Sequence, residues 1–436
     1  MITDKTGSEN VVNRKKAPRI KDAVEFNLTL KPYEKYVLDN GVEVYAVNTG
    51  AEEVMMVEWV FSAGNWYEEQ NGIAAATNYL IKNGTKNRNA FAISEHVDFY
   101  GAYVNRNCYN ETANITLHTL SKHLPNLLPV VAEMVSQSVF PEQELEIYKQ
   151  NLRQRLDVNL KKCDFVANRK IDEYLYGIDH PYGKYAVRET YDQLERGAIA
   201  DFHHRFYQHG KCIIFVAGVL PADIRAQLNA HFGHLPLHSK APANVEHPIV
   251  AAGEKKFRIS NDPDGVQGAI RLARPFMTRK HPDFPAAQVL NAIFGGFFGS
   301  RLMSNIREEK GYTYGIHSYF QSHLACSSWM ISTEAGRDVC EATVSEVYKE
   351  MKALREGKVP DDELMLVKNY LIGGILGDLD GPFQIMGRWK NVILNDLPDD
   401  YFYTSVDAIK KVQSEKLQEL AEQWLREEDF YELVVI

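Results

Sequence analysis

Two stretches of this chain repeat one another, and this repeat constrains the fold more than any other feature of the sequence. Phe140-Pro141-Glu142-Gln143-Glu144-Leu145 matches Val359-Pro360-Asp361-Asp362-Glu363-Leu364. At the same separation, the strand-like run Ile214 to Ala217 matches the closing run Leu433 to Ile436. Repeats of about 200 residues are duplicated domains, whereas solenoid units recur every ~20 to 50 residues. The chain is therefore expected to fold as two similar halves.

Local patterns within the first half predict both strands and helices. Asn40-Gly41 lies between two strand-like runs, and this dipeptide is the strongest short-range signal for a β-hairpin. Apolar residues recur with helical spacing between Leu124 and Val135, and Pro141 suits the first turn of another helix. Each half is expected to be an α+β unit, with a mostly antiparallel sheet packed against helices.

The same patterns predict where the halves begin and end. Residues 1–25 are polar and basic and are expected to form a flexible tail. The first half is assigned to residues 26–234 and the second half to residues 257–436. The segment 235–256 between them contains several prolines and is predicted to be a linker.

Charge and composition exclude several classes of function. A net charge of -9 argues against a dedicated nucleic-acid binder, and no apolar run is long enough to span a bilayer. The polar start is not a secretory signal, and the five cysteines contain no C-x-x-C pair. A cytoplasmic protein is expected, and a leader removed upstream of Met1 is the alternative left open.

Searches for catalytic motifs find none. H-x-x-E-H fails because Ala92 precedes Glu95-His96 at the place of the first histidine, and H-E-x-x-H, G-x-S-x-G and the phosphate-binding loop are absent. His231, His234 and His238 straddle a predicted helix end and a proline-rich segment, so surface histidines are favoured over a metal site. The residues alone describe a two-domain protein without a visible catalytic set.

One predicted helix has a particular place in the repeat. Gly72 to Thr85 is predicted to be a buried helix that ends at Gly84. Ala75 and Tyr79 are four residues apart, so they project from the same face, with Asn78 beside them. An H-x-x-E-H motif would place its two imidazoles and its carboxylate on such a face.

Several stretches resemble a known family, the inverted zinc metallopeptidases of the pitrilysin, insulinase and mitochondrial processing peptidase type. The resemblance runs from about Phe26 to Ile436 and includes the hairpin at Leu38-Asp39-Asn40-Gly41 and the frame from Gly72 to Thr85. Its most specific stretch runs from Gly295-Gly296 through Ser300-Arg301-Leu302 to Gly311-Tyr312-Thr313-Tyr314. Members are built from two α+β halves, and paired modules enclose a peptide chamber.

The resemblance implies that the zinc site is lost from this chain. The two histidine ligands fall on Ala75 and Tyr79, the glutamate base falls on Asn78, and the third ligand falls near Arg155. A supporting acidic residue falls near Tyr148. Alanine has no lone pair to donate, tyrosine is a poor zinc ligand at neutral pH, and an arginine repels a cation. No catalytic zinc is expected at these positions.

Arg307 and Tyr314, by contrast, keep the family pattern. The resemblance implies that they hold the backbone of a peptide substrate near the scissile bond, since both side chains can donate to a carbonyl. The alternative is an exposed arginine at a helix end beside Glu308 and Glu309, with a half-buried strand tyrosine.

Three functions remain open at this point. The favoured one is a non-catalytic subunit like those of bacterial two-chain peptidases, which supplies Arg307 and Tyr314 to a homologous partner. That partner would carry zinc and the intact H-x-x-E-H, and the substrate would be an unfolded peptide. The second is a purely structural or assembly subunit of the same fold. The third, least favoured, is a self-sufficient peptidase that uses another site.

Overall fold

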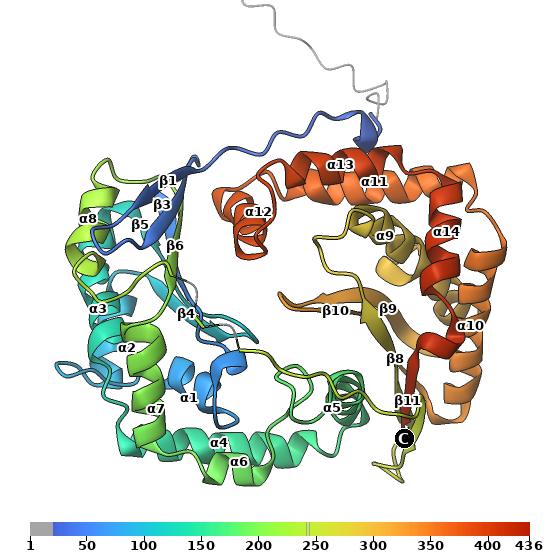
Figure 1. The fold of residues 1–436 in the computed structure, drawn as a ribbon, viewed down its shortest axis with the longest axis horizontal. Coiled ribbons are helices and arrows are strands. Elements are labelled where there is room, and N and C mark those ends of the chain that lie inside the picture. The colour runs from blue at the N-terminus through green and yellow to red at the C-terminus, as the bar shows by residue number, and fades with distance from the viewer. Residues whose placement is uncertain (1–20, 241, 244) are drawn as a thin grey trace, which may run out of the picture.

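The computed structural model describes residues 21–436 except residues 241 and 244, and these residues form two β-sheets that are each flanked by helices (Figure 1). The predicted α+β fold with two similar halves is confirmed. Residues 1–20 of the expected tail lie outside the described residues.

The first half builds a six-stranded sheet in the order β1-β2-β6-β3-β5-β4. The predicted hairpin at Asn40-Gly41 joins β1 to β2, and Gly41 adopts a φ of 83°, in the left-handed region that favours glycine. β2 and β6 are parallel, while the other pairs are antiparallel. The strands are β1 (Glu34–Val37), β2 (Glu43–Asn48), β3 (Val54–Phe61), β4 (Tyr103–Cys108), β5 (Ala113–Leu120) and β6 (Cys212–Gly218).

The second half repeats this topology in a five-stranded sheet with the order β7-β11-β8-β10-β9. β11 lies between a parallel neighbour, β7, and an antiparallel one, β8, as β6 lies between β2 and β3. The match of Ile214–Ala217 to Leu433–Ile436 in the sequence therefore corresponds to equivalent strands. The strands are β7 (Lys256–Ile259), β8 (Gln267–Phe276), β9 (Thr313–Ser322), β10 (Ser327–Gly336) and β11 (Tyr431–Val435).

The helices follow the same repeat. α3, α4, α5 and α7 of the first half recur, at nearly the separation of the sequence repeat, as α10, α11, α12 and α14. In the first half the helices are α1 (Ile73–Leu80), α2 (Ala90–Phe99), α3 (Leu124–Gln137), α4 (Glu142–Asn159), α5 (Cys163–Tyr176), α6 (Arg188–Asp192), α7 (Arg196–His203) and α8 (Ile224–Phe232). In the second half they are α9 (Phe284–Asn291), α10 (Cys340–Glu356), α11 (Asp361–Gly377), α12 (Pro382–Leu394), α13 (Tyr401–Lys411) and α14 (Ser414–Trp424).

Helix α1 is shorter than predicted. It ends at Leu80, and Gly84 does not terminate it but lies in an isolated β-bridge with Asn89. A side chain at residue 84 would meet the ring of Pro141, with a Cβ only 2.8 Å from its Cγ. The glycine is therefore needed for the close approach of the segment that precedes α4.

The two halves exchange helices across their sheets. Along β2 and β6, alternate residues face opposite sides, so Val44 and Ile214 pack toward α1, α3 and α8, whereas Tyr45 and Phe215 join the core that contains α12. α12 belongs to the second half. Reciprocally, α5 of the first half covers β8 and β11 of the second sheet. Since α5 and α12 are equivalent in the repeat, the exchange is symmetrical.

Described residues just before Phe26 contact the second half of the chain. Ala23–Glu25 form a 3-10 turn against α11, where the backbone N–H of Val24 donates to Asn369 Oδ1 at 3.1 Å. From there the chain crosses to β1 (Figure 1), and on the way the carbonyl of Lys31 accepts a hydrogen bond from Trp389 Nε1 at 2.7 Å.

Between Phe232 and Lys256 the described residues contain no helix or strand, and this segment joins the halves. The backbone N–H groups of Val250 and Ala252 donate to carbonyls of Tyr176 and Tyr174 at the end of α5. No helix among the described residues is both long and apolar enough to cross a bilayer.

Candidate functional site

The structure brings the positions of the expected zinc site together in one pocket of about 340 Å³. Ala75, Asn78 and Tyr79 reach it from α1, and Tyr148 and Arg155 reach it from α4. The remaining lining comes from α4 and from β4 with the residue that follows it, and comprises Arg106, Asn107, Cys108, Tyr109, Asn151 and Leu152.

The three α1 residues differ in burial, so the prediction of a wholly buried helix was wrong on one face. Ala75 is exposed and Tyr79 is 42% exposed, because this face borders the pocket. Asn78 is buried, and its side-chain amide donates to the carbonyl of Asn114 and to the hydroxyl of Tyr207, both at 3.1 Å. Two neutral acceptors therefore hold the side chain of Asn78, at the position where the resemblance would place the catalytic base.

Aromatic rings fill the place between α1 and α4. Tyr79 stacks on Tyr148 with a centroid separation of 4.6 Å and an interplanar angle of 30°. The guanidinium of Arg106 lies 4.9 Å from the centroid of the Tyr79 ring and also donates to the Tyr79 carbonyl. Burial raises the pKa of Tyr148, so its phenol is neutral at physiological pH.

The residues of this pocket do not fit a zinc ion. The pocket lining contains no histidine, aspartate or glutamate, and the described part of the chain holds no group of three or more such side chains or cysteines that could bind a metal. Burial raises the pKa of Cys108 to about 12, which keeps it a thiol rather than a metal-binding thiolate. The nearby Glu68 is occupied, since it pairs with Lys184 at 2.8 Å and accepts the N–H of Ala74 at 3.0 Å.

Arg307 and Tyr314 lie next to each other in the second half. Arg307 belongs to a π-helical segment, Met303–Glu309, and Tyr314 lies at the start of β9. Arg307 Nε donates to the carbonyl of Tyr314 at 3.0 Å, and the guanidinium lies 4.7 Å from the centroid of the Phe298 ring. Arg307 also pairs with Glu308. The guanidinium is thus positioned by a backbone acceptor, an aromatic ring and a carboxylate.

Tyr314 is 88% exposed, so the alternative of a half-buried strand tyrosine was wrong. β9 is an edge strand of the second sheet, and β4, which carries Arg106, is an edge strand of the first. The turns after these two strands meet, because Asn110 Nδ2 and His323 Nδ1 are 3.0 Å apart and Leu324 donates its N–H to Glu111.

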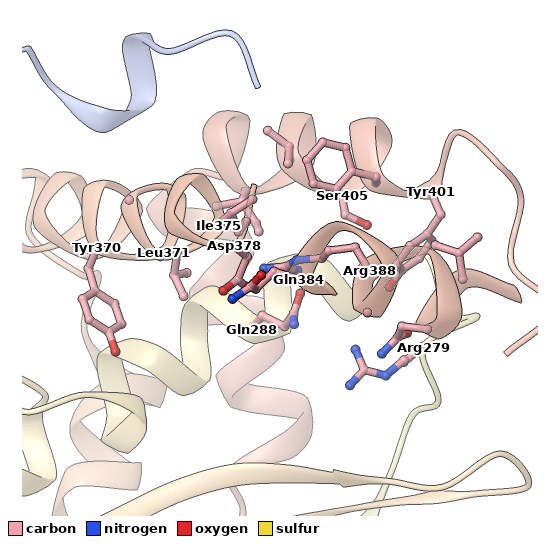
Figure 2. A pocket seen from close by; sticks show the side chains of 18 of the residues that line it. Arg279, Gln288, Tyr370, Leu371, Ile375, Asp378, Gln384, Arg388, Tyr401 and Ser405 are labelled. Carbon is pink, nitrogen blue, oxygen red and sulfur yellow. The ribbon is translucent and has the colours of Figure 1, made fainter. Parts of the chain in front are cut away.

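A larger pocket, of about 970 Å³, lies among α9, α11, α12 and α13 (Figure 2). Arg279 and Arg388 line it with Gln288, Gln384 and Ser405, and Arg388 pairs with Asp378 at 2.5 Å. All of its lining comes from the second half, and it includes none of the predicted site residues.

Two features of the first pocket were not predicted from sequence. Arg106 lines the pocket and touches Tyr79, and Asn114 holds Asn78 from β5. A single arginine or asparagine within a strand has no spacing that marks it, so no sequence signal pointed to either residue.

Comparison with known proteins fits this architecture. The family profile described as "Insulinase (Peptidase family M16)" matches residues 44–180, and the one described as "Peptidase M16 inactive domain" matches residues 193–371. The chain belongs to peptidase family M16 and is a homologue of zinc proteases. At the positions where the resemblance would place the zinc site, this chain has Ala75, Asn78, Tyr79 and Arg155.

Relatives with about the same length include both proteases and a non-peptidase. The chain is 23% identical to "Uncharacterized zinc protease YmxG" of Bacillus subtilis (strain 168), over 83% of this chain and 88% of the relative. It is 23% identical to "Non-peptidase homolog YmxG" of Helicobacter pylori, over 83% and 84%. It is 22% identical to "Mitochondrial-processing peptidase subunit beta" of Saccharomyces cerevisiae, over 86% and 85%.

Two crystal structures share the fold. A peptidase M16 inactive domain from Pseudomonas fluorescens superposes with a TM-score of 0.82 at 23% identity, covering 92% of this chain and 98% of that one. A protease from Helicobacter pylori gives a TM-score of 0.83 at 17% identity, covering 93% and 100%.

Proposed function

We propose that this chain is a non-catalytic subunit of a two-chain zinc peptidase and that it contributes Arg307 and Tyr314 to the binding of peptide substrates. The partner is a homologous chain with an intact H-x-x-E-H, which carries the zinc. The observation that carries the proposal is the contrast between the two sites. The metal positions have neutral or cationic side chains, whereas Arg307 is positioned and Tyr314 is exposed.

The chemistry of the pair suits a peptide carbonyl. A guanidinium and a phenol both donate hydrogen bonds, and these bonds strengthen as negative charge develops on the carbonyl oxygen in the transition state. Nε of Arg307 donates to the carbonyl of Tyr314 and Nη1 donates to Glu308, so the proposed donor to a substrate carbonyl is the other terminal nitrogen, Nη2. The edge strand β9 begins at the same place, and an extended peptide can pair with such an edge through its backbone.

The experiment is reconstitution with a homologous chain that has an intact H-x-x-E-H, encoded in the same genome. Neither chain alone should cleave a quenched fluorescent peptide, and the mixture should. Arg307→Ala and Tyr314→Phe should each lower kcat/KM of the mixture by about 10²-fold, in the range found for removal of a transition-state donor. Arg225→Ala, an exposed arginine on α8, is the matched control and should leave the rate unchanged. Unchanged rates in both site variants would contradict the proposal.

A second candidate is a purely structural subunit of an assembly. One observation favours it, which is that Arg307 already pairs with Glu308 and with the Tyr314 carbonyl inside this chain. In that case both substitutions would leave every activity of the assembly unchanged and would alter only the stability of the chain.

A further inference from the structure

The pocket between α1 and α4, where the resemblance places the zinc site, carries positively charged side chains, whereas a cation-binding site carries negatively charged ones. Two arginines, Arg106 and Arg155, are among the residues that line it, and none of its lining residues is acidic. A site that binds Zn²⁺ needs anionic or lone-pair donors, whereas two cations at one pocket attract an anion. The residues of this pocket therefore favour an anion over a metal cation.

Nothing within the described chain neutralises these two arginines. Arg155 is exposed on α4 and makes no ion pair with any described residue. Asp157, two residues further along α4, is already paired with Arg188 at 2.9 Å, and Asp192 on α6 is paired with Arg153 of α4 at 2.5 Å.

Among the described residues, the groups that accept hydrogen bonds from the Arg106 side chain are neutral. Its Nη1 donates to the carbonyl of Tyr79 and lies 3.5 Å from Asn83 Oδ1, and its guanidinium carbon lies 4.9 Å from the centroid of the Tyr79 ring. Burial lowers the pKa of Arg106, because desolvation disfavours the charged form. An anion that entered the pocket would offset that cost.

The rest of the lining is suited to an organic anion. The side-chain amides of Asn107 and Asn151 supply neutral donors, and Tyr79, Tyr109 and Leu152 supply apolar surface. A pocket of about 340 Å³ lies at the lower end of the range for small-ligand sites. It is bordered by β4, an edge strand of the first sheet, beside which an extended chain can lie.

We infer that this pocket binds a carboxylate group of a peptide, held between the guanidinium groups of Arg155 and Arg106. The peptidic nature of the ligand rests on the proposed function, while the preference for a carboxylate rests on the pocket alone. The carboxylate comes either from a free peptide C-terminus or from an acidic side chain, and both present the same two oxygens to a guanidinium fork.

The test measures binding by titration calorimetry on the isolated full chain, without a partner or turnover, so its result does not depend on finding peptidase activity. Three acetylated pentapeptides of alanine and valine are compared: one amidated and neutral, one with a free C-terminus, and one amidated with a central glutamate. At least one acidic peptide should bind more than about tenfold tighter than the neutral one, and the tighter of the two identifies the source of the carboxylate. Added salt should lower the affinity of the acidic peptides and leave that of the neutral peptide unchanged.

Variants locate the site. Arg155→Gln should remove the preference for the acidic peptide, and Arg155→Lys should keep part of it because the charge remains. Arg153→Gln, on the same helix but paired with Asp192, is the matched control and should behave as the wild type. Melting temperatures confirm that the variants are folded. Equal binding of neutral and acidic peptides, or an unchanged preference in Arg155→Gln, would overturn the inference.

Discussion

Lys390 on α12 donates hydrogen bonds to both carboxylate oxygens of Glu58 on β3, at 3.1 and 2.9 Å. Glu58 is nearly fully buried and also accepts from the side chain of Asn114, whose backbone carbonyl in turn accepts from Asn78. A cation from the second half is therefore connected through two residues to α1, the helix that carries Ala75, Asn78 and Tyr79.

Lys390→Met should lower the free energy of unfolding by about 2 kcal/mol, because it leaves a buried carboxylate without its cation. Urea denaturation followed by circular dichroism measures the loss. Adding Glu58→Gln should restore part of it, since the buried charge is then gone. Lys352→Met, which breaks an exposed pair with Glu356, is the control and should cost less than about 0.5 kcal/mol. An equal effect of the two lysine substitutions would rule out a role for the buried pair.

Zinc binding should depend on four positions together. The purified wild-type chain should hold well below about one zinc per molecule by plasma mass spectrometry. Ala75→His, Asn78→Glu and Tyr79→His combined with Arg155→Glu should bind about one, since the four side chains converge on one pocket. The triple variant that keeps Arg155 should bind more than about tenfold more weakly, because the cation repels the metal. Stoichiometric zinc in the wild type would contradict the proposed loss.

The setting of Arg307 predicts graded effects in the reconstituted peptidase. Arg307→Lys keeps the charge but loses the Nε–H that donates to Tyr314, so kcat/KM should fall by about tenfold. Phe298→Leu removes the ring beneath the guanidinium and should cost about two- to fivefold, the effect of a cation–π contact of ~0.5–1 kcal/mol. If Phe298→Leu were more damaging than Arg307→Ala, the ring rather than the guanidinium would be the group that binds substrate.

Stability should fall on mild acidification because of a buried histidine. His203 packs against Phe140 and Tyr207, and burial lowers its pKa from 6.5 to about 4. Between pH 4 and pH 6.5, His203 is protonated in the unfolded chain but neutral in the folded chain. The free energy of unfolding is therefore highest above pH 6.5 and declines as the pH falls toward 4.

Urea titrations at about pH 7 and about pH 5 measure this slope. His203→Phe keeps an aromatic ring at the site and should reduce the difference in unfolding free energy between the two conditions. His317→Gln, at an exposed position on β9, is the control and should leave the difference as in the wild type. A slope that is unaffected by His203→Phe would assign the acid sensitivity to other groups.

The sequence predicted those parts of the fold that depend on local patterns or on the repeat. Asn40-Gly41 predicted its hairpin because only a few residue types adopt the backbone conformation of that turn. The helical spacing of Ala75, Asn78 and Tyr79 predicted that they lie together, and in the structure they line one pocket. The end of α1 was missed because Gly84 serves the approach of Pro141 instead of a helix cap. Arg106 was missed because its partners come from α1 and α4, which only tertiary packing brings to β4.

The symmetrical exchange of α5 and α12 has a consequence for the kind of molecule this is. A chain that consisted of the first half alone would leave Tyr45, Phe215 and their neighbours exposed on one side of its sheet, because α12 belongs to the second half. A second copy could cover them with its α5, the helix equivalent to α12. The protein thus has the architecture of a helix-swapped homodimer whose two subunits have been joined into one polypeptide. An association that would otherwise be bimolecular has become intramolecular, so the closure of its two cores does not weaken on dilution.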